Sequence, residues 1–135
     1  MRRPIVSILL FTLGLGSCTQ QAPTLAGQWM PVSAELAGQD FPVARFGGAT
    51  LQLTDSTYEF AGDKGTYVVL SAKSPGTMDI QGREGPNAGR TIPAIFELSD
   101  EQLTVGYQLG SRERPIEFTS PKGSQVLIVE YRRMH

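Results

Sequence analysis

From residue 26 onwards, apolar and polar side chains alternate along the chain. Leu51 and Leu53, for example, fall on one face of an extended segment, and Gln52 and Thr54 fall on the other. This alternation is typical of strands with one buried face, whereas an amphipathic helix repeats its apolar positions about every 3.6 residues. The pattern predicts eight strands, at Gly27–Leu36, Ala49–Thr54, Thr57–Ala61, Gly65–Ala72, Thr77–Gly82, Arg90–Leu98, Gln102–Gln108 and Gln125–Arg133.

Turn-forming residues separate these segments, as in Gly62-Asp63-Lys64 and Ser74-Pro75-Gly76. Short strands joined in sequence favour an antiparallel meander, which protects its edges best by closing into a barrel. We therefore predict an all-β fold for residues 26–135, a small antiparallel up-and-down barrel, with an open sandwich as the rival. Ala37–Gly48 is the longest expected connection and would partly cover one mouth of the barrel, and Glu84–Gly89 forms a second exposed loop.

The alternation also predicts which side chains face inward. They are Leu51, Leu53, Tyr58, Phe60, Met78, Ile80, Phe96, Leu103, Val105, Tyr107, Leu127 and Val129. A barrel of about eight strands either holds one small ligand or fills with side chains. Short strands and large inward residues favour a filled interior, but they do not exclude an interior that holds a ligand. Asp79 and Glu97 alternate with apolar neighbours and are expected on the solvated outer face rather than as a catalytic acid/base pair.

The first 25 residues have a different pattern. Met1-Arg2-Arg3 is positively charged, and Ile5–Leu15 is apolar without a charge. This run is too short to span a bilayer, which needs about 20 apolar residues. A short apolar run between a positive start and small residues is typical of a secretory signal. We predict a signal peptide at residues 1–17 and a polar tether at residues 18–25.

The end of this signal, Leu15-Gly16-Ser17-Cys18, resembles the lipobox of bacterial lipoproteins. The resemblance implies that the signal is cleaved before Cys18, which then carries a diacylglycerol and anchors the protein to a membrane. Stable anchoring requires more than one acyl chain, as lipoproteins have. Thr19 rather than an aspartate follows the cysteine, so the outer membrane, facing the periplasm, is the expected location. The alternative is a plain signal peptide cut near Ser17 or Ala22.

Two further resemblances concern the domain. Gly27-Gln28-Trp29 on the first strand and Arg132-Arg133 on the last resemble the lipocalin and calycin pattern. This pattern implies that Trp29 packs against one of these arginines and closes the barrel, because a guanidinium stacks well on indole.

A longer series of segments resembles a family of uncharacterised secreted bacterial domains, abundant in planctomycetes and described as lipocalin-like. The segments are Leu25–Trp29, Gly65–Tyr67, Met78–Ile80, Ile95–Leu98, Arg114–Phe118 and Tyr131–Arg133. The resemblance implies a fold and a secreted location, but it brings no catalytic residue.

Composition narrows the possible chemistry. Twelve basic and thirteen acidic residues give a net charge of −1, which argues against a nucleic-acid binder. Cys18 is the only cysteine and His135 the only histidine, which excludes a zinc site built from both types and an intramolecular disulfide. We expect no cofactor, no metal and no enzymatic activity. The charge cluster at Arg112–Glu117 is read as a rim set of salt bridges in preference to an anion site at Arg114.

The sequence therefore predicts a monomeric, lipid-anchored envelope protein that binds a small apolar ligand without catalysis. The alternative is a protein-interaction or inhibitor module with a filled interior, in which the loops Ala37–Gly48 and Glu84–Gly89 contact an envelope protein.

Overall fold

The structure, a computed structural model, describes residues 23–135. The predicted signal peptide and Cys18 lie outside the described residues. The strands are β1 (Gly27–Leu36), β2 (Gln39–Asp40), β3 (Leu51–Leu53), β4 (Thr57–Phe60), β5 (Asp63–Ser71), β6 (Gly76–Glu84), β7 (Thr91–Leu98), β8 (Gln102–Gln108) and β9 (Val126–Arg133). The described part also has a short 3-10 helix, η1 (Val43–Phe46). It contains no helix that is long and apolar enough to cross a membrane.

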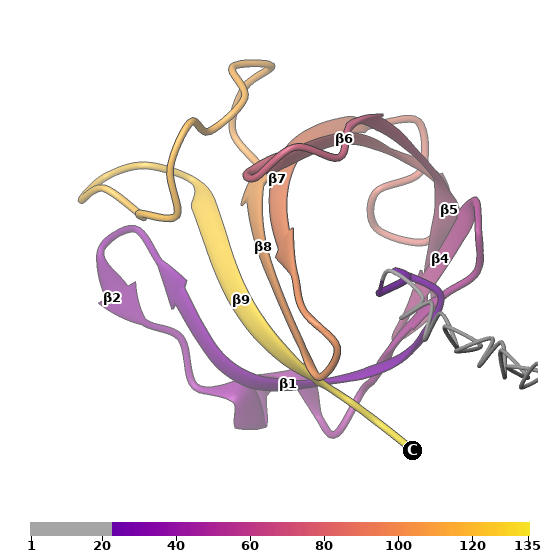
Figure 1. Ribbon diagram of the computed structural model, residues 1–135. Helices are drawn as coiled ribbons and strands as arrows, with labels where there is room; N and C mark the ends of the chain where they lie inside the picture. The colour runs from indigo at the N-terminus through magenta and orange to yellow at the C-terminus, as the bar shows by residue number, and fades with distance from the viewer. Residues whose placement is uncertain (1–22) are drawn as a thin grey trace, which may run out of the picture.

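Eight of these strands form a closed antiparallel barrel, as the sequence predicts (Figure 1). Their order is β1-β3-β4-β5-β6-β7-β8-β9, and β1 also pairs with β9 to close the ring. The closing register places Trp29 opposite Arg133 and Leu36 opposite Leu127. The two-residue strand β2 pairs only with the end of β1 and lies outside the ring. The open sandwich is therefore ruled out, and closure removes the unpaired strand edges that such a sandwich would expose.

Strand boundaries differ from the prediction mainly where turns are tighter than expected. β5 begins at Asp63 rather than Gly65, because Ala61 and Gly62 make a two-residue hairpin between Phe60 and Asp63. Both turn residues have positive φ, 50° and 84°, which suits the right-handed twist of paired strands. The predicted turn at Gly62-Asp63-Lys64 is therefore wrong by one to two residues.

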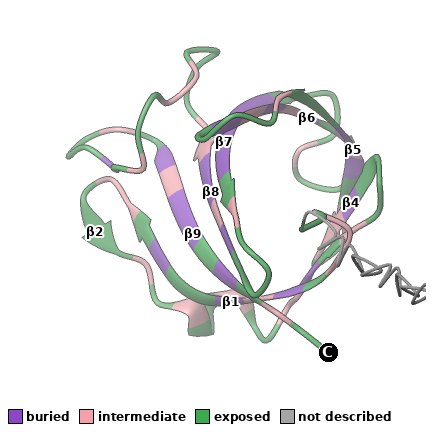
Figure 2. Ribbon diagram, in the orientation of Figure 1, coloured by how far each residue is buried: buried purple, intermediate pink, exposed green. Residues whose placement is uncertain are grey.

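The barrel has two unlike ends. At the end where β1 begins and β9 ends, hereafter the closed end, the interior is filled. The side chains that fill it include Trp29, Leu103 and Val105, which are fully buried. The ring of Phe96 lies against Gly76, where an added Cβ would stand 2.4 Å from it. Buried residues lie along all the strands of the ring, whereas exposed residues dominate the loops (Figure 2).

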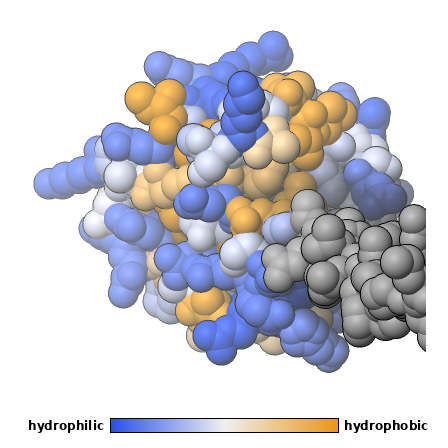
Figure 3. Space-filling view, viewed as in Figure 1, coloured by the Kyte–Doolittle hydropathy of each residue, from blue (hydrophilic) through white to orange (hydrophobic). Residues whose placement is uncertain are grey.

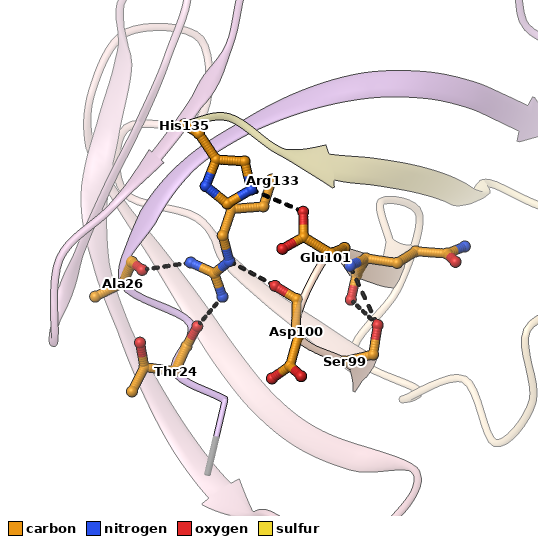
Figure 4. A network of polar contacts seen from close by, with 8 residues as sticks. Thr24, Ala26, Ser99, Asp100, Glu101, Arg133 and His135 are labelled. Carbon is orange, nitrogen blue, oxygen red and sulfur yellow. Dashed lines mark hydrogen bonds and ion pairs between the residues drawn. The ribbon is translucent and has the colours of Figure 1, made fainter. Parts of the chain in front are cut away.

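Arg133 seals the closed end (Figure 4). Its guanidinium carbon lies 4.2 Å from the centre of the Trp29 ring. The same group donates to the carbonyl oxygens of Asp100 at 2.8 Å, Ala26 at 3.0 Å and Thr24 at 2.7 Å. Gly27 leaves room for this group, because a Cβ there would lie 2.8 Å from Nη1 of Arg133. Of the two arginines expected to close the barrel, Arg133 does so, whereas Arg132 is exposed.

The longest connection is the segment between β8 and β9, residues 109–125, and not Ala37–Gly48 as predicted. It runs along the outside of the barrel (Figure 1). Arg114 fastens it to β6 and β7 by donating to the carbonyl oxygens of Met78 at 2.6 Å and Ala94 at 3.0 Å and by pairing with Asp79. Ile95 and Ile128 face outward on β7 and β9 yet are buried, so the barrel carries a small second apolar layer on its outer face.

Replacing Arg133 by lysine should destabilise the protein by about 1–3 kcal/mol. Lysine keeps the charge but loses the planar fork that donates to three carbonyls at once. The measurement is the free energy of unfolding in urea. Arg132→Lys is the matched control, since this neighbour is exposed and its replacement should change the free energy by less than about 0.5 kcal/mol. Equal effects of the two substitutions would contradict the assignment of Arg133 as the closing residue.

Candidate functional site

The interior of the barrel contains a cavity of about 230 Å³, which opens at the end away from the closed end. Its walls come from β3 to β9 and from the loops at that end of the barrel, hereafter the open end. Deep wall residues such as Met78, Ile80 and Val129 are buried, whereas Arg90 is exposed and Asp63, Asn87, Phe46 and Leu109 are half-buried. The exposed part of the lining thus marks a mouth at the open end.

The structure brings nine of the residues predicted to line a cavity into its wall. They are Leu51, Leu53, Tyr58, Phe60, Met78, Ile80, Tyr107, Leu127 and Val129. Phe96, Val105 and Leu103 also face inward, but they belong to the packed core and do not line the cavity. Their inward orientation was predicted correctly, but alternation identifies only the face of a strand and not the height along the barrel axis at which a side chain lies.

Several lining residues were missed. Tyr67, Ile92 and Tyr131 lie on strands, in step with inward neighbours, so the alternation contained a signal for them. Phe46 and Leu109 reach the mouth from η1 and from the segment after β8, where no periodic pattern exists. Their place in the cavity lining could not be predicted, because it depends on how these two connections fold over the mouth.

A chain of polar contacts crosses the mouth. The Tyr58 hydroxyl donates to Oδ1 of Asp63 at 3.0 Å, and Nδ2 of Asn87 donates to Oδ2 of the same carboxylate at 2.7 Å. Nη1 of Arg90 donates to Oδ1 of Asn87 at 3.1 Å, and its Nη2 donates to the carbonyl oxygen of Leu109. These bonds tie the β4–β5 hairpin, the β6–β7 loop and the end of β8 together, so the mouth is a cross-linked rim.

Two tyrosines meet inside the cavity. The hydroxyl oxygens of Tyr107 and Tyr131 lie 2.7 Å apart in a mutual hydrogen bond. Burial raises the pKa of Tyr107 to about 12 and the pKa of Tyr131 well above its usual value. Burial also raises the pKa of Tyr58, with a further contribution from its bond to Asp63. All of these hydroxyls are therefore protonated at neutral pH and act as hydrogen-bond donors.

The described residues do not form a metal-binding cluster. No group of three or more His, Cys, Asp and Glu side chains within residues 23–135 is placed to hold a metal ion. Asp79 lies on the outer face in an ion pair with Arg114, and Glu97 accepts a bond from Ser74 at 3.1 Å. Since Arg114 is engaged by Asp79 and by two carbonyl oxygens, it belongs to a structural clasp and not to an anion site.

Comparisons of the chain with protein-family models, with curated proteins and with solved structures find no match. The function therefore has to be inferred from the barrel and its cavity.

The ionisation of the four tyrosines of the chain tests whether their hydroxyls are buried. Burial raises the pKa of Tyr67 as well as those of the other three, so tyrosinate absorbance should appear at a higher pH in the folded protein than in the unfolded chain. Phenols in the unfolded chain ionise near pH 10. Folding stability is therefore retained below about pH 10 and lost as the pH rises towards 12. A folded protein whose tyrosines titrate near pH 10 would contradict the buried hydroxyl pair.

Proposed function

We propose that this protein is a noncatalytic binding module that holds a small apolar ligand inside the barrel. The observation that carries the proposal is the cavity of about 230 Å³, which is open at one end and walled mainly by aliphatic and aromatic side chains. A concave apolar site with a few fixed polar groups is the usual form of a small-molecule site. The cross-linked rim supports the same reading, because a preformed mouth reduces the ordering cost of binding.

The alternative, an interaction module with a filled interior, has less support. Only the closed half of the barrel is filled. The two loops that such a module would use for contacts each contribute to the mouth instead, through Phe46 in one and Asn87 in the other. Both loops thus form part of the cavity's lining.

Kinship with lipocalin-like secreted domains forms part of this proposal. Its support is the contact of Arg133 with Trp29, which places an arginine of the last strand against the tryptophan of the first. The barrel shape adds further support, since eight strands can enclose one small ligand.

Anchoring through Cys18 in the cell envelope is the second part of the proposal and rests on the lipobox-like sequence. The described chain enters at the closed end, where Thr24 and Ala26 bind Arg133. Cys18 lies five positions before Pro23, and a chain of this length spans at most about 18 Å. An anchor there holds the closed end towards the membrane and turns the mouth towards the aqueous side, from which the ligand would enter.

Filling the cavity tests the binding function. We expect Leu127→Trp to weaken the binding of ethylbenzene by about tenfold or more, because the added indole takes the space of the ligand. Val68→Trp is the control, since Val68 is 61% exposed on β5 and does not line the cavity. Isothermal titration calorimetry gives the affinities. Failure of the unsubstituted protein to bind, or equal binding by both variants, would count against the cavity as the site.

Labelling with a radioactive fatty acid tests the anchor. We expect the native chain to incorporate the label and to sediment with membranes, because acyl chains bury in the bilayer. Cys18→Ser should lose both properties without a change in the fold. Equal labelling of the two chains would exclude Cys18 as the attachment point.

A further inference from the structure

The pair of tyrosines in the cavity has one more hydrogen-bond donor than the protein uses. Two hydroxyls carry two protons, and the mutual bond between Tyr107 and Tyr131 uses one of them. Among residues 23–135, neither hydroxyl takes part in another hydrogen bond. Since both residues line the cavity, the spare O–H is available to whatever occupies it.

Tyr67 shows the contrast. It lines the same cavity, but its hydroxyl already donates to the carbonyl oxygen of Thr54 at 2.6 Å. The Tyr58 hydroxyl is likewise engaged, by Asp63. The Tyr107–Tyr131 pair is therefore the place on the wall where a tyrosine hydroxyl can serve a ligand. A buried donor without an acceptor is unfavourable, so an occupant that supplies an acceptor gains over one that does not.

The volume limits the size of the occupant. An apolar cavity of about 150 Å³ is enough for benzene. By proportion, 230 Å³ has room for an occupant of roughly nine non-hydrogen atoms.

The charges around the cavity indicate that the occupant is uncharged. Asp63 is the acidic residue of the lining, and its carboxylate disfavours a buried anion. Arg90 is the basic residue of the lining, but it lies at the mouth and is bound to Asn87 and to the carbonyl oxygen of Leu109. An anion at the tyrosine pair would thus be desolvated without a cation beside it, which is costly, and a cationic group offers no acceptor to the spare O–H.

We propose that the Tyr107–Tyr131 pair determines the specificity of the cavity by donating a hydrogen bond to the carbonyl oxygen of a small, uncharged, largely apolar ligand. This inference rests on the proposed function, because it requires that the cavity bind a ligand at all. It goes further in naming the ligand class and the donor.

Two probes of nearly equal shape separate the donor from the apolar walls. Acetophenone and α-methylstyrene each have about nine non-hydrogen atoms, matching the cavity, and differ in a carbonyl oxygen that replaces a methylene group. Both are titrated into the full chain carrying Cys18→Ser, into its Tyr107→Phe/Tyr131→Phe variant and into its Tyr67→Phe variant. The ratio of the two affinities is compared between proteins, so differences in the hydration of the probes cancel.

We expect the ratio, as acetophenone over α-methylstyrene, to fall about three- to tenfold in the double variant and by less in Tyr67→Phe, whose hydroxyl is already bound to the carbonyl oxygen of Thr54. Benzoate should bind more weakly than acetophenone to the unsubstituted tyrosine pair. If both probes bind and the double variant leaves the ratio unchanged, the specificity role is overturned while the binding function stands. If neither probe binds to the protein with all its tyrosines, the proposed function itself fails.

A measurement on the unsubstituted pair keeps the test independent of how the double variant folds. Infrared spectra of acetophenone labelled with ¹³C at the carbonyl should show a stretching frequency lowered in the complex, as in a hydrogen-bonding solvent. A bound carbonyl that absorbs as it does in hexane would overturn the inference.

Discussion

The fold depends on the contact that joins the first strand of the barrel to the last. Arg133 lies over Trp29 and donates to carbonyl oxygens of residues more than a hundred positions earlier in the chain. A meander of strands has two free edges until such a junction forms, and the β1–β9 ladder then removes both. The junction also decides where empty space can exist. Because Trp29 and Arg133 fill the closed end, the cavity and its mouth lie in the other half.

This division explains why the polar groups of the interior are distributed unevenly. At the closed end, three backbone carbonyl oxygens accept hydrogen bonds from the guanidinium of Arg133 (Figure 4). At the open end, side chains from Tyr58 through Asp63 and Asn87 to Arg90 bind one another, and the wall below them is apolar apart from tyrosine hydroxyls. On the face seen in Figure 3, hydrophilic residues surround several apolar patches. Buried donors with raised pKa values remain protonated, so the cavity keeps the same hydrogen-bonding character over a wide range of pH.

Period-two alternation and turn residues were sufficient to predict the barrel, since each short strand must bury one face and its neighbours are joined by hairpins. They could not predict the segment at residues 109–125, whose path is fixed by Arg114 reaching carbonyl oxygens on β6 and β7. The site was predictable in part for the same reason. Tyr107 and Tyr131 are 24 residues apart, and their hydroxyls meet only because β8 and β9 pair in one register.

The barrel is filled at one end and hollow at the other. A crystal structure of the protein under xenon pressure would show this division, because xenon enters dry apolar cavities without a chemical preference. We expect a xenon atom among Met78, Ile80 and Val129, and none between Trp29 and Leu103. If side chains fill the open end and xenon finds no site there, the barrel has no cavity for a ligand.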